Sequence, residues 1–328
     1  MSPAQEHWRS GASLERLRQR AALLAQIRDF FAQRAVLEVD TPQLVRHAVT
    51  DVNLHSAQVN WPASAAAPRF LHTSAEYAMK RLLAGGSGDI YQLCHVFRAE
   101  EQGPLHNAEF MMLEWYRVGW PCAQLMGEVD ALLRSLWPQS GAGLPAAQYL
   151  SYEQAFIGSL GCNPLTDSDA TLADCARAQG FDDRLLMGCS RDEILDLMMG
   201  ARIGPQLGRS GPLFLHRYPA SQAALARLDP EDPRVALRFE LYLEGVELAN
   251  GFEELADAAL QRARFEADRE LRRTRGLEMP ACDEYLLAAL AHGLPACSGV
   301  ALGVDRLLML ATGAASIEDV MAFSSEHA

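Results

Sequence analysis

Residues 97–116 read Phe-Arg-Ala-Glu-Glu-Gln-Gly-Pro-Leu-His-Asn-Ala-Glu-Phe-Met-Met-Leu-Glu-Trp-Tyr. They connect an apolar run at 90–100 to a second one at 108–119. Because the connection contains Gly and Pro, the stretch predicts two antiparallel strands joined by a loop. Alternation in a strand over 90–100 would place Arg98 and Glu100 on one face, as a cation for phosphate and an acceptor for an adenine amino group.

A second segment, Gly-Val-Ala-Leu-Gly-Val-Asp-Arg, occupies residues 299–306. Its small residues Gly299, Ala301 and Gly303 leave one face of a short strand bare, so a planar ligand would have room against the backbone. Arg306 would open the next helix, and its guanidinium suits phosphate oxygens. Taken separately, the two segments also fit a solvated ion pair and a closely packed strand. Together they predict an ATP site.

An acidic hairpin is predicted around the turn Glu244-Gly245. A two-residue turn pairs Tyr242 with Glu247 and pairs Glu240 with Ala249. Glu240 and Glu247 then become diagonal neighbours on one face, and their carboxylates repel unless a cation lies between them. Mg²⁺ bound with ATP phosphates would fill that place. From the residues alone, a solvated acidic hairpin is an equal alternative.

The composition is that of a globular chain of 328 residues with 49% hydrophobic content. Lys and Arg total 29 against 42 Asp and Glu, and the net charge of −13 opposes unguided attraction to nucleic acid. Seven cysteines form no Cys-x-x-Cys pair, which favours a reducing cytoplasm. Neither a signal sequence nor an apolar membrane span is apparent, so no membrane association is expected.

The order of elements predicts an α+β fold, in which an antiparallel sheet is flanked by helices. Residues 13–34 have the periodicity of an amphipathic helix. We expect one catalytic domain over residues 1–328, with a mostly helical insertion at about 144–210. No Gly-x-x-x-x-Gly-Lys-Ser/Thr segment or Rossmann fingerprint is present, so the nucleotide site would be built differently.

These segments and their order resemble the class II aminoacyl-tRNA synthetases, in the lysyl-type version. Residues 97–116 are similar to motif 2, residues 299–306 to motif 3, and the helix and strand ending at Val39-Asp40-Thr41-Pro42 to motif 1. The resemblance implies a class II synthetase-like sheet and covers only the catalytic part, because motif 1 begins too early to leave room for an anticodon-binding barrel. Ala99 and Ala75 replace a common Asn and Pro without removing a charged group.

The resemblance implies that the chain binds ATP with Mg²⁺. It gives Arg98 to the α-phosphate and Arg306 to the γ-phosphate as the catalytic residues, and Phe110 to the adenine ring. Other expected ATP contacts are Ala99, Glu100, Asn107, Glu247, Leu248 and Gly303. Glu240 and Glu247 match the positions of metal-binding glutamates.

The expected amino-acid site is acidic. By resemblance, Glu76 of Ser74-Ala75-Glu76 would hold an amino group, and Glu114, Tyr116 and Glu254 would surround a side-chain amine. Buried carboxylates without a partner are costly, so such a pocket would select a lysine-like diamino acid. Asn250 would contact the substrate carboxylate. Ala301 stands where lysyl-tRNA synthetases usually have Gly, and its methyl group would favour a β-amino over an α-amino group.

Within the family, the chain is most similar to a stand-alone branch that modifies a protein. This implies that (R)-β-lysine is activated as an acyl-adenylate and transferred to a lysine of elongation factor P, with no tRNA. Two alternatives remain: a truncated lysyl-type synthetase acting on tRNA or a free amine, and a non-catalytic regulatory paralogue. A homodimer is also expected, with Leu24, Ile27 and Phe31 supplying part of the contact.

Overall fold

The computed structural model describes residues 8–60, 68–137 and 143–328. Its centre is an eight-stranded sheet in the order β1-β5-β6-β11-β10-β9-β8-β7. The six inner strands pair antiparallel, while β1 and β7 at the edges run parallel to their neighbours. The strands are β1 Leu37–Glu38, β5 Ile90–Phe97, β6 Glu109–Val118, β7 Gln148–Ser151, β8 Leu213–Pro219, β9 Val235–Leu243, β10 Val246–Glu253 and β11 Cys297–Gly303.

The predicted α+β class is therefore confirmed. A separate three-stranded sheet contains β2 Leu44–Val45, β3 Gln58–Val59 and β4 Arg69–Leu71. The predicted strand over 90–100 is shorter than expected, since β5 ends at Phe97. The β5–β6 pair is the antiparallel hairpin expected from residues 97–116.

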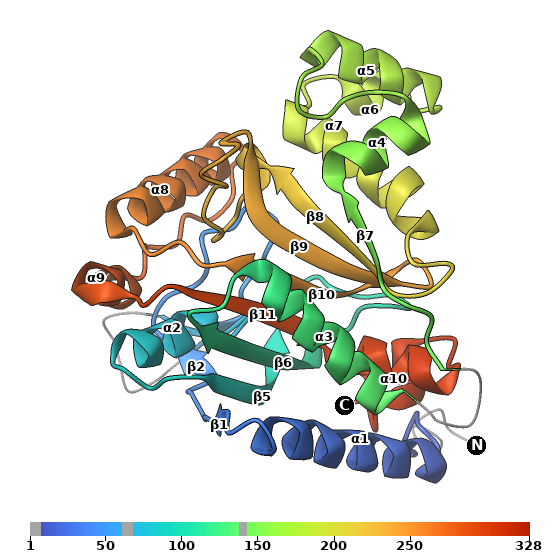
Figure 1. Ribbon diagram of the computed structural model, residues 1–328, viewed down its shortest axis with the longest axis vertical. Helices are drawn as coiled ribbons and strands as arrows, with labels where there is room; N and C mark the ends of the chain where they lie inside the picture. Colours follow the sequence, from blue (N-terminus) through green and yellow to red (C-terminus); the bar gives the residue numbers. More distant parts are fainter. Residues whose placement is uncertain (1–7, 61–67, 138–142) are drawn as a thin grey trace.

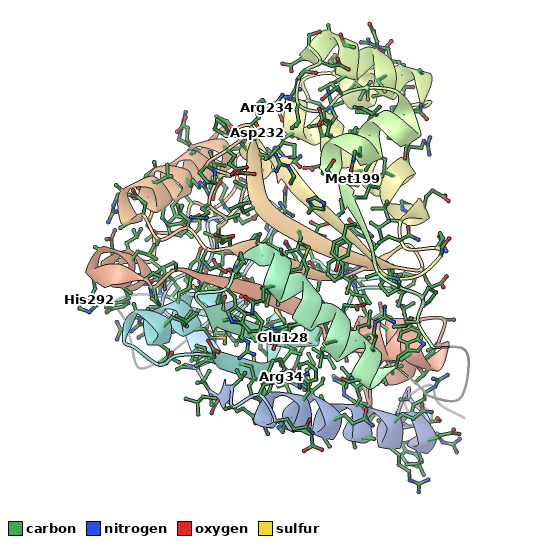
Figure 2. All side chains as sticks on the ribbon, in the orientation of Figure 1. Arg34, Glu128, Met199, Asp232, Arg234 and His292 are labelled. Carbon is green, nitrogen blue, oxygen red and sulfur yellow. The ribbon has the colours of Figure 1, made fainter. Side chains whose placement is uncertain are left out.

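One face of the sheet is covered by α1 Leu14–Ala32, α3 Cys122–Leu136 and α10 Val304–Thr312 (Figure 1). The ring of Phe31 stacks on Tyr91 with 4.4 Å between centroids, and Ile27 is fully buried in the same core. The predicted dimer stripe was therefore wrong for Ile27 and Phe31, because the sheet beneath α1 already covers them. Arg34 at the end of α1 and Glu128 on α3 form a 3.7 Å ion pair between the two helices (Figure 2).

The opposite face packs against α2 Glu76–Ala84, α8 Ala258–Thr274 and α9 Glu284–Gly293. Met79 and Leu83 of α2 lie against Ile90 and Val96 of β5 in this second core. The two cores alternate along the strands, because successive side chains of a strand point to opposite faces.

Four short helices lie inside the stretch 144–210 and extend beyond the β7–β8 edge in Figure 1. They are α4 Tyr152–Leu160, α5 Asp169–Ala178, α6 Asp183–Leu186 and α7 Arg191–Met198. A π-helical turn, Met199–Ile203, and a 3-10 turn, Gly204–Gln206, lead back toward β8. Their own hydrophobic core, which includes Phe156 and Leu195, also contacts Leu215 of β8. Two further 3-10 turns in the described residues are Ala220–Gln222 and Ile317–Val320.

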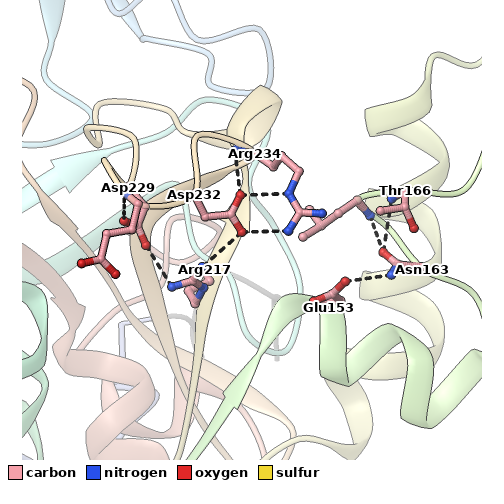
Figure 3. A network of polar contacts seen from close by, with 9 residues as sticks. Glu153, Asn163, Thr166, Arg217, Asp229, Asp232 and Arg234 are labelled. Atoms are coloured by element: carbon pink, nitrogen blue, oxygen red, sulfur yellow. Dashed lines mark hydrogen bonds and ion pairs between the residues drawn. The ribbon is translucent and has the colours of Figure 1, made fainter.

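A polar network fixes the connection between β8 and β9 beside these helices (Figure 3). Arg234 donates to both carboxylate oxygens of Asp232 at 2.9 Å, and Arg217 donates to Asp229 at 2.9 Å and to Asp232 at 3.3 Å. The hydrogen bond from Arg234 lowers the pKa of Asp232 to about 2. Nearby, Asn163 donates to Glu153 at 2.7 Å.

Across the described ranges, no helix combines the length and apolar character needed to cross a membrane.

Candidate active site

A cavity of about 1330 Å³ brings together most of the residues predicted to bind ATP and the amino acid. Its lining includes Ser74, Ala75, Glu76, Arg98, Asn107, Phe110, Glu240, Glu247, Leu248, Asn250, Ala301, Gly303 and Arg306. Ala99 and Glu100 lie in the turn after β5. Glu114, Tyr116 and Glu254 are buried at one end of this region, where Glu114 contacts the lining residues Ser74 and Ala75. Segments that lie about 200 residues apart, such as Arg306 and Leu105, thus meet at one site.

Arg306 is held in place at the start of α10. Its Nε donates to the Leu105 carbonyl and its Nη1 to the Glu247 carbonyl, both at 3.0 Å. Its Nη2 lies 2.7 Å from His106 Nε2. Burial and the neighbouring charge of Arg306 lower the pKa of His106, so the neutral imidazole accepts this hydrogen bond. These contacts fix the guanidinium while it still lines the cavity.

Arg98 follows β5 directly and lies over the ring of Phe110, with 5.1 Å from Cζ to the ring centroid. Its Nη1 is 3.3 Å from Glu101 Oε1, whereas its buried Nε has no hydrogen-bond partner within the described structure. A buried donor without a partner is costly, so an acceptor brought to this N–H by a ligand would be stabilising.

The predicted pairing of Arg98 with Glu100 on one strand face is wrong. The strand ends at Phe97, and Glu100 has a φ of 73°, which turns the chain out of the strand. Glu101 takes the expected place: it pairs with Arg98 and lines the cavity. The sequence did signal a loop here through Gly103 and Pro104. That loop begins directly after Phe97, earlier than the apolar alternation over 90–100 indicated.

Asn107 connects the cavity to the C-terminal segment. Its Oδ1 accepts from the Ser325 N–H at 3.0 Å and from the Ser325 hydroxyl at 2.8 Å, while its Nδ2 donates to the Glu109 carbonyl at 2.6 Å. Asn107 is thus positioned by the chain itself at the predicted nucleotide end.

The acidic hairpin forms, and its register contains a β-bulge. Tyr242 pairs with Glu247 as predicted, but Glu240 pairs with Asn250 and not with Ala249. The irregularity lies between Glu247 and Ala249 and adds one residue to β10. In a regular strand, residues 247 and 250 would point to opposite faces, whereas the bulge turns both toward the cavity. The prediction missed this because a bulge has no signature in hydrophobic alternation.

Glu240 and Glu247 are close enough to repel each other. Burial and the charge of Glu240 raise the pKa of Glu247 to about 7, while Arg306 and Arg238 counter the rise. Glu240 accepts from Arg238 Nη2 at 2.6 Å and from the Tyr242 hydroxyl at 2.7 Å.

Carboxylate oxygens are the donors that Mg²⁺ prefers, and a cation between these two would relieve their repulsion. Within the described parts of the chain, no group of three or more His, Cys, Asp or Glu residues is arranged as a metal site. The two glutamates are the donors that would hold a Mg²⁺ ion here.

The other end of the cavity holds the buried carboxylates. Glu114 accepts from the Ser74 hydroxyl and from the Ala75 N–H, both at 3.0 Å. The Ser74 hydroxyl also accepts from the Glu76 N–H at 3.0 Å at the start of α2. Burial, followed by the charge of Glu76, raises the pKa of Glu114 to about 7. Burial likewise raises the pKa of Glu254 to about 7, although the charge of Lys80 opposes this rise.

Lys80 is a residue of this end that the predicted site did not include. Its Nζ lies 2.6 Å from Glu76 Oε1 and 2.6 Å from Glu254 Oε2, and the side chain is 1% exposed. The spacing of Glu76 and Lys80 by four residues on a helix was the available signal. It indicated an ion pair, but could not indicate the second contact with Glu254.

At Gly299 of β11, the space left by the missing side chain is filled by neighbouring residues of the protein. A Cβ atom added at Gly299 would lie 2.3 Å from Tyr116 Cε1 and 2.6 Å from Glu254 Oε1. Glycine is required there so that this phenol and carboxylate can lie against the strand. Ala301 pairs with Glu114 on one side and Asn250 on the other. Its methyl group therefore lies between the amine end and the predicted carboxylate contact, and the Asn250 Oδ1 is buried without a hydrogen-bond partner in the described structure.

The chain is similar to known proteins over nearly its whole length. The family model for tRNA synthetases class II (D, K and N) matches residues 6–327. The chain is 48% identical over 324 residues to a protein of Pectobacterium carotovorum subsp. carotovorum named elongation factor P–(R)-β-lysine ligase, covering 98% of each chain.

Proteins with the same name from Vibrio vulnificus and Salmonella gallinarum are also similar. The first is 49% identical over 322 residues, covering 97% of this chain and 98% of the relative. The second is 46% identical over 324 residues, covering 98% of each. The chain therefore belongs to the class II tRNA synthetase family (D, K and N).

Proposed function

We propose that this protein is an AMP-forming ligase that activates (R)-β-lysine with ATP and transfers it to a lysine side chain of elongation factor P. One observation carries the proposal: Arg98 and Arg306 line one end of a single cavity, and Glu76 lines the other end beside the buried carboxylates of Glu114 and Glu254. The arginines suit the phosphates of ATP, and the glutamates suit a substrate with two amino groups. The names of the similar proteins give the particular amino acid and acceptor.

The chain's own residues would act by positioning and by spreading charge. Asn250 would orient the substrate carboxylate, and Glu76, Glu114 and Glu254 would hold the amines. A carboxylate oxygen then attacks the α-phosphorus of ATP, the bond to the bridging oxygen breaks, and pyrophosphate leaves. Bound Mg²⁺, held by Glu240 and Glu247, would neutralise phosphate charge.

Arg98 would stabilise the charge that develops on the α-phosphate, and Arg306 would bind the γ-phosphate. Phe110 offers its ring to adenine, and Glu247, Leu248 and Gly303 line the same end of the cavity. In the second step, the acceptor amine attacks the acyl carbon of the adenylate, loses a proton and releases AMP. Neither step needs a nucleophile from the protein.

We further propose a homodimer built on the motif 1 segment, in the cytoplasm. Among the described residues, no strand pairs with the outer side of the edge strand β1, and its Leu37 is 55% exposed. Light scattering is expected to give about twice the chain mass, because class II motif 1 segments pair across a two-fold axis. A monomer at micromolar concentration would contradict this assembly.

The function is tested by incubating the protein with ATP, (R)-β-lysine and either elongation factor P or bulk tRNA. Mass spectrometry of both acceptors should show one added β-lysyl group on elongation factor P and no charged tRNA. Aminoacylated tRNA would support the truncated synthetase instead. Absence of lysine-stimulated pyrophosphate exchange would support a non-catalytic paralogue.

A further inference from the structure

The acidic end of the cavity contains a charge that the proposed reaction does not use. Lys80 is the single lysine of the chain, and its ammonium lies between Glu76 and Glu254, 2.6 Å from each. The side chain of Lys80 is 1% exposed. Glu76 lines the cavity, and Lys80 lies behind it. A buried ammonium needs such partners, and a buried glutamate pair needs such a cation.

We propose that Lys80 is a positioning residue of the substrate site, which holds Glu76 and Glu254 in place and sets the charge of the pocket to match a diamino acid. This rests on the proposed function. The three carboxylates of Glu76, Glu114 and Glu254 face one fixed ammonium, so two of them are left to pair with the two ammonium groups of a diamino acid. The substrate carboxylate lies outside this set, at the predicted contact with Asn250. Without Lys80, one carboxylate of the set would have no cationic partner.

Several buried phenols and thiols around this cluster stay neutral. Burial raises the pKa of the phenol of Tyr116 on β6 and of the thiols of Cys94 on β5, Cys297 on β11 and Cys122 on α3. The charge of Arg98 reaches Glu114 from the loop after β5 and lowers its pKa slightly against burial. These phenols and thiols therefore do not change charge near neutral pH.

Lys80 itself stays charged over the working range. Burial alone would lower its pKa, but the adjacent carboxylates of Glu254 and Glu76 reverse this and raise it above the ordinary value. The ammonium is thus a permanent countercharge, and the site is tuned by the protons that the glutamates gain or lose.

The wild-type protein provides a direct test, because isotope-labelled lysine gives one signal in nuclear magnetic resonance. The signal should remain that of an ammonium at a pH of about 10.4, where half of ordinary lysines are deprotonated. Saturating (R)-β-lysine should shift it, whereas norleucine, which lacks the second amine, should not. An ordinary titration, or no shift with saturating (R)-β-lysine, would overturn the proposal.

A second test uses Lys80→Met. Loss of the ammonium should raise KM for β-lysine about tenfold or more, with a smaller change in kcat, and should move the acidic limb of kcat/KM upward by about one pH unit, because the glutamates then hold their protons more tightly. Lys80→Arg should retain the wild-type limb. Met79→Leu disturbs the packing of the same helix without changing charge, and should leave the limb in place.

The two failures can be told apart by ATP–pyrophosphate exchange on the wild-type protein. Without β-lysine-stimulated exchange, the proposed function itself fails. With normal exchange but an unshifted limb in a folded Lys80→Met variant, the role of Lys80 is disproved while the function stands. If Lys80→Met does not fold, the magnetic resonance experiment on the wild type decides.

Discussion

The two ends of the cavity handle buried charge in opposite ways. At the nucleotide end, arginines remain charged at every working pH, and backbone carbonyls hold Arg306 in place. At the amine end, Glu114 and Glu254 are nearly fully buried and have a pKa near neutrality. The first end is organised before any ligand arrives. The second is completed by its ligand, because its carboxylates lack enough countercharge on their own. Loss of charge should therefore affect rate at the first end, and affinity and pH response at the second.

The largest effect is expected from Arg98→Ala. Removing a preorganised donor to the charge that develops on the α-phosphate should cost about 3 kcal/mol, or roughly a hundredfold in kcat/KM. Pyrophosphate exchange measures this loss. Arg234→Ala is the matched control, because its side chain is 54% exposed and pairs with Asp232 outside the cavity. Equal exchange rates in both variants would remove Arg98 from the reaction.

Glu114→Gln should act on affinity. It replaces a charged partner of the substrate amine by a neutral one of the same shape. KM for β-lysine should therefore rise by a factor that corresponds to about 2 kcal/mol of lost binding free energy, within the range for hydrogen bonds to charged groups. KM for ATP should change little. A loss that falls mainly on kcat would contradict the division between the two ends.

The two ends should differ in how the KM of their substrate depends on pH. The change in KM should be at most roughly tenfold per pH unit, or about 1.4 kcal/mol. As pH rises through about 7, Glu114 and Glu254 lose protons and gain the charge that binds an ammonium, so KM for β-lysine should fall. Glu247 also titrates near 7, but bound Mg²⁺ should keep it ionised. Initial rates at several pH values should therefore show that saturating Mg²⁺ suppresses the pH dependence of KM for ATP but not that of KM for β-lysine. Suppression of both would show that the ends are coupled.

The smallest effect is expected from Ala301→Gly. Removing a methyl group between Glu114 and Asn250 should make room for an α-amino group and shift selectivity toward α-lysine by about 1 kcal/mol, the low end for a methylene-sized change. Competition between the two lysines in modification of elongation factor P measures the shift. An unchanged preference would show that Ala301 does not select the substrate.

Much of the scaffold was predictable because its helices and strands follow the local periodicity of apolar residues in the sequence. The helix over 13–34, the hairpin that follows residue 90 and the helical stretch inside 144–210 all form as expected. The gathering of Arg98 and Arg306 was predicted from the chemistry of the two segments and from the family resemblance, since periodicity alone does not report distances between remote segments.

The errors arise where tertiary packing overrides a local pattern. Ile27 and Phe31 looked available for a partner, but the sheet covers them. Glu100 followed the alternation of its strand, but the chain turns before it. The bulge before Ala249 changes the register by one residue, and nothing in the spacing of Glu240 and Glu247 announces it.

The solitary buried lysine also decides how the protein behaves toward amine chemistry. Reagents that acylate exposed side-chain amines will find none, because Lys80 is enclosed and keeps its proton. An acyl-adenylate is such a reagent. In a mixture with a lysine-bearing acceptor, any acyl group found on a lysine can thus be assigned to the acceptor without separating the proteins. The enzyme would offer no exposed lysine to its own acyl-adenylate intermediate, and trypsin would cleave its exposed chain only after arginine.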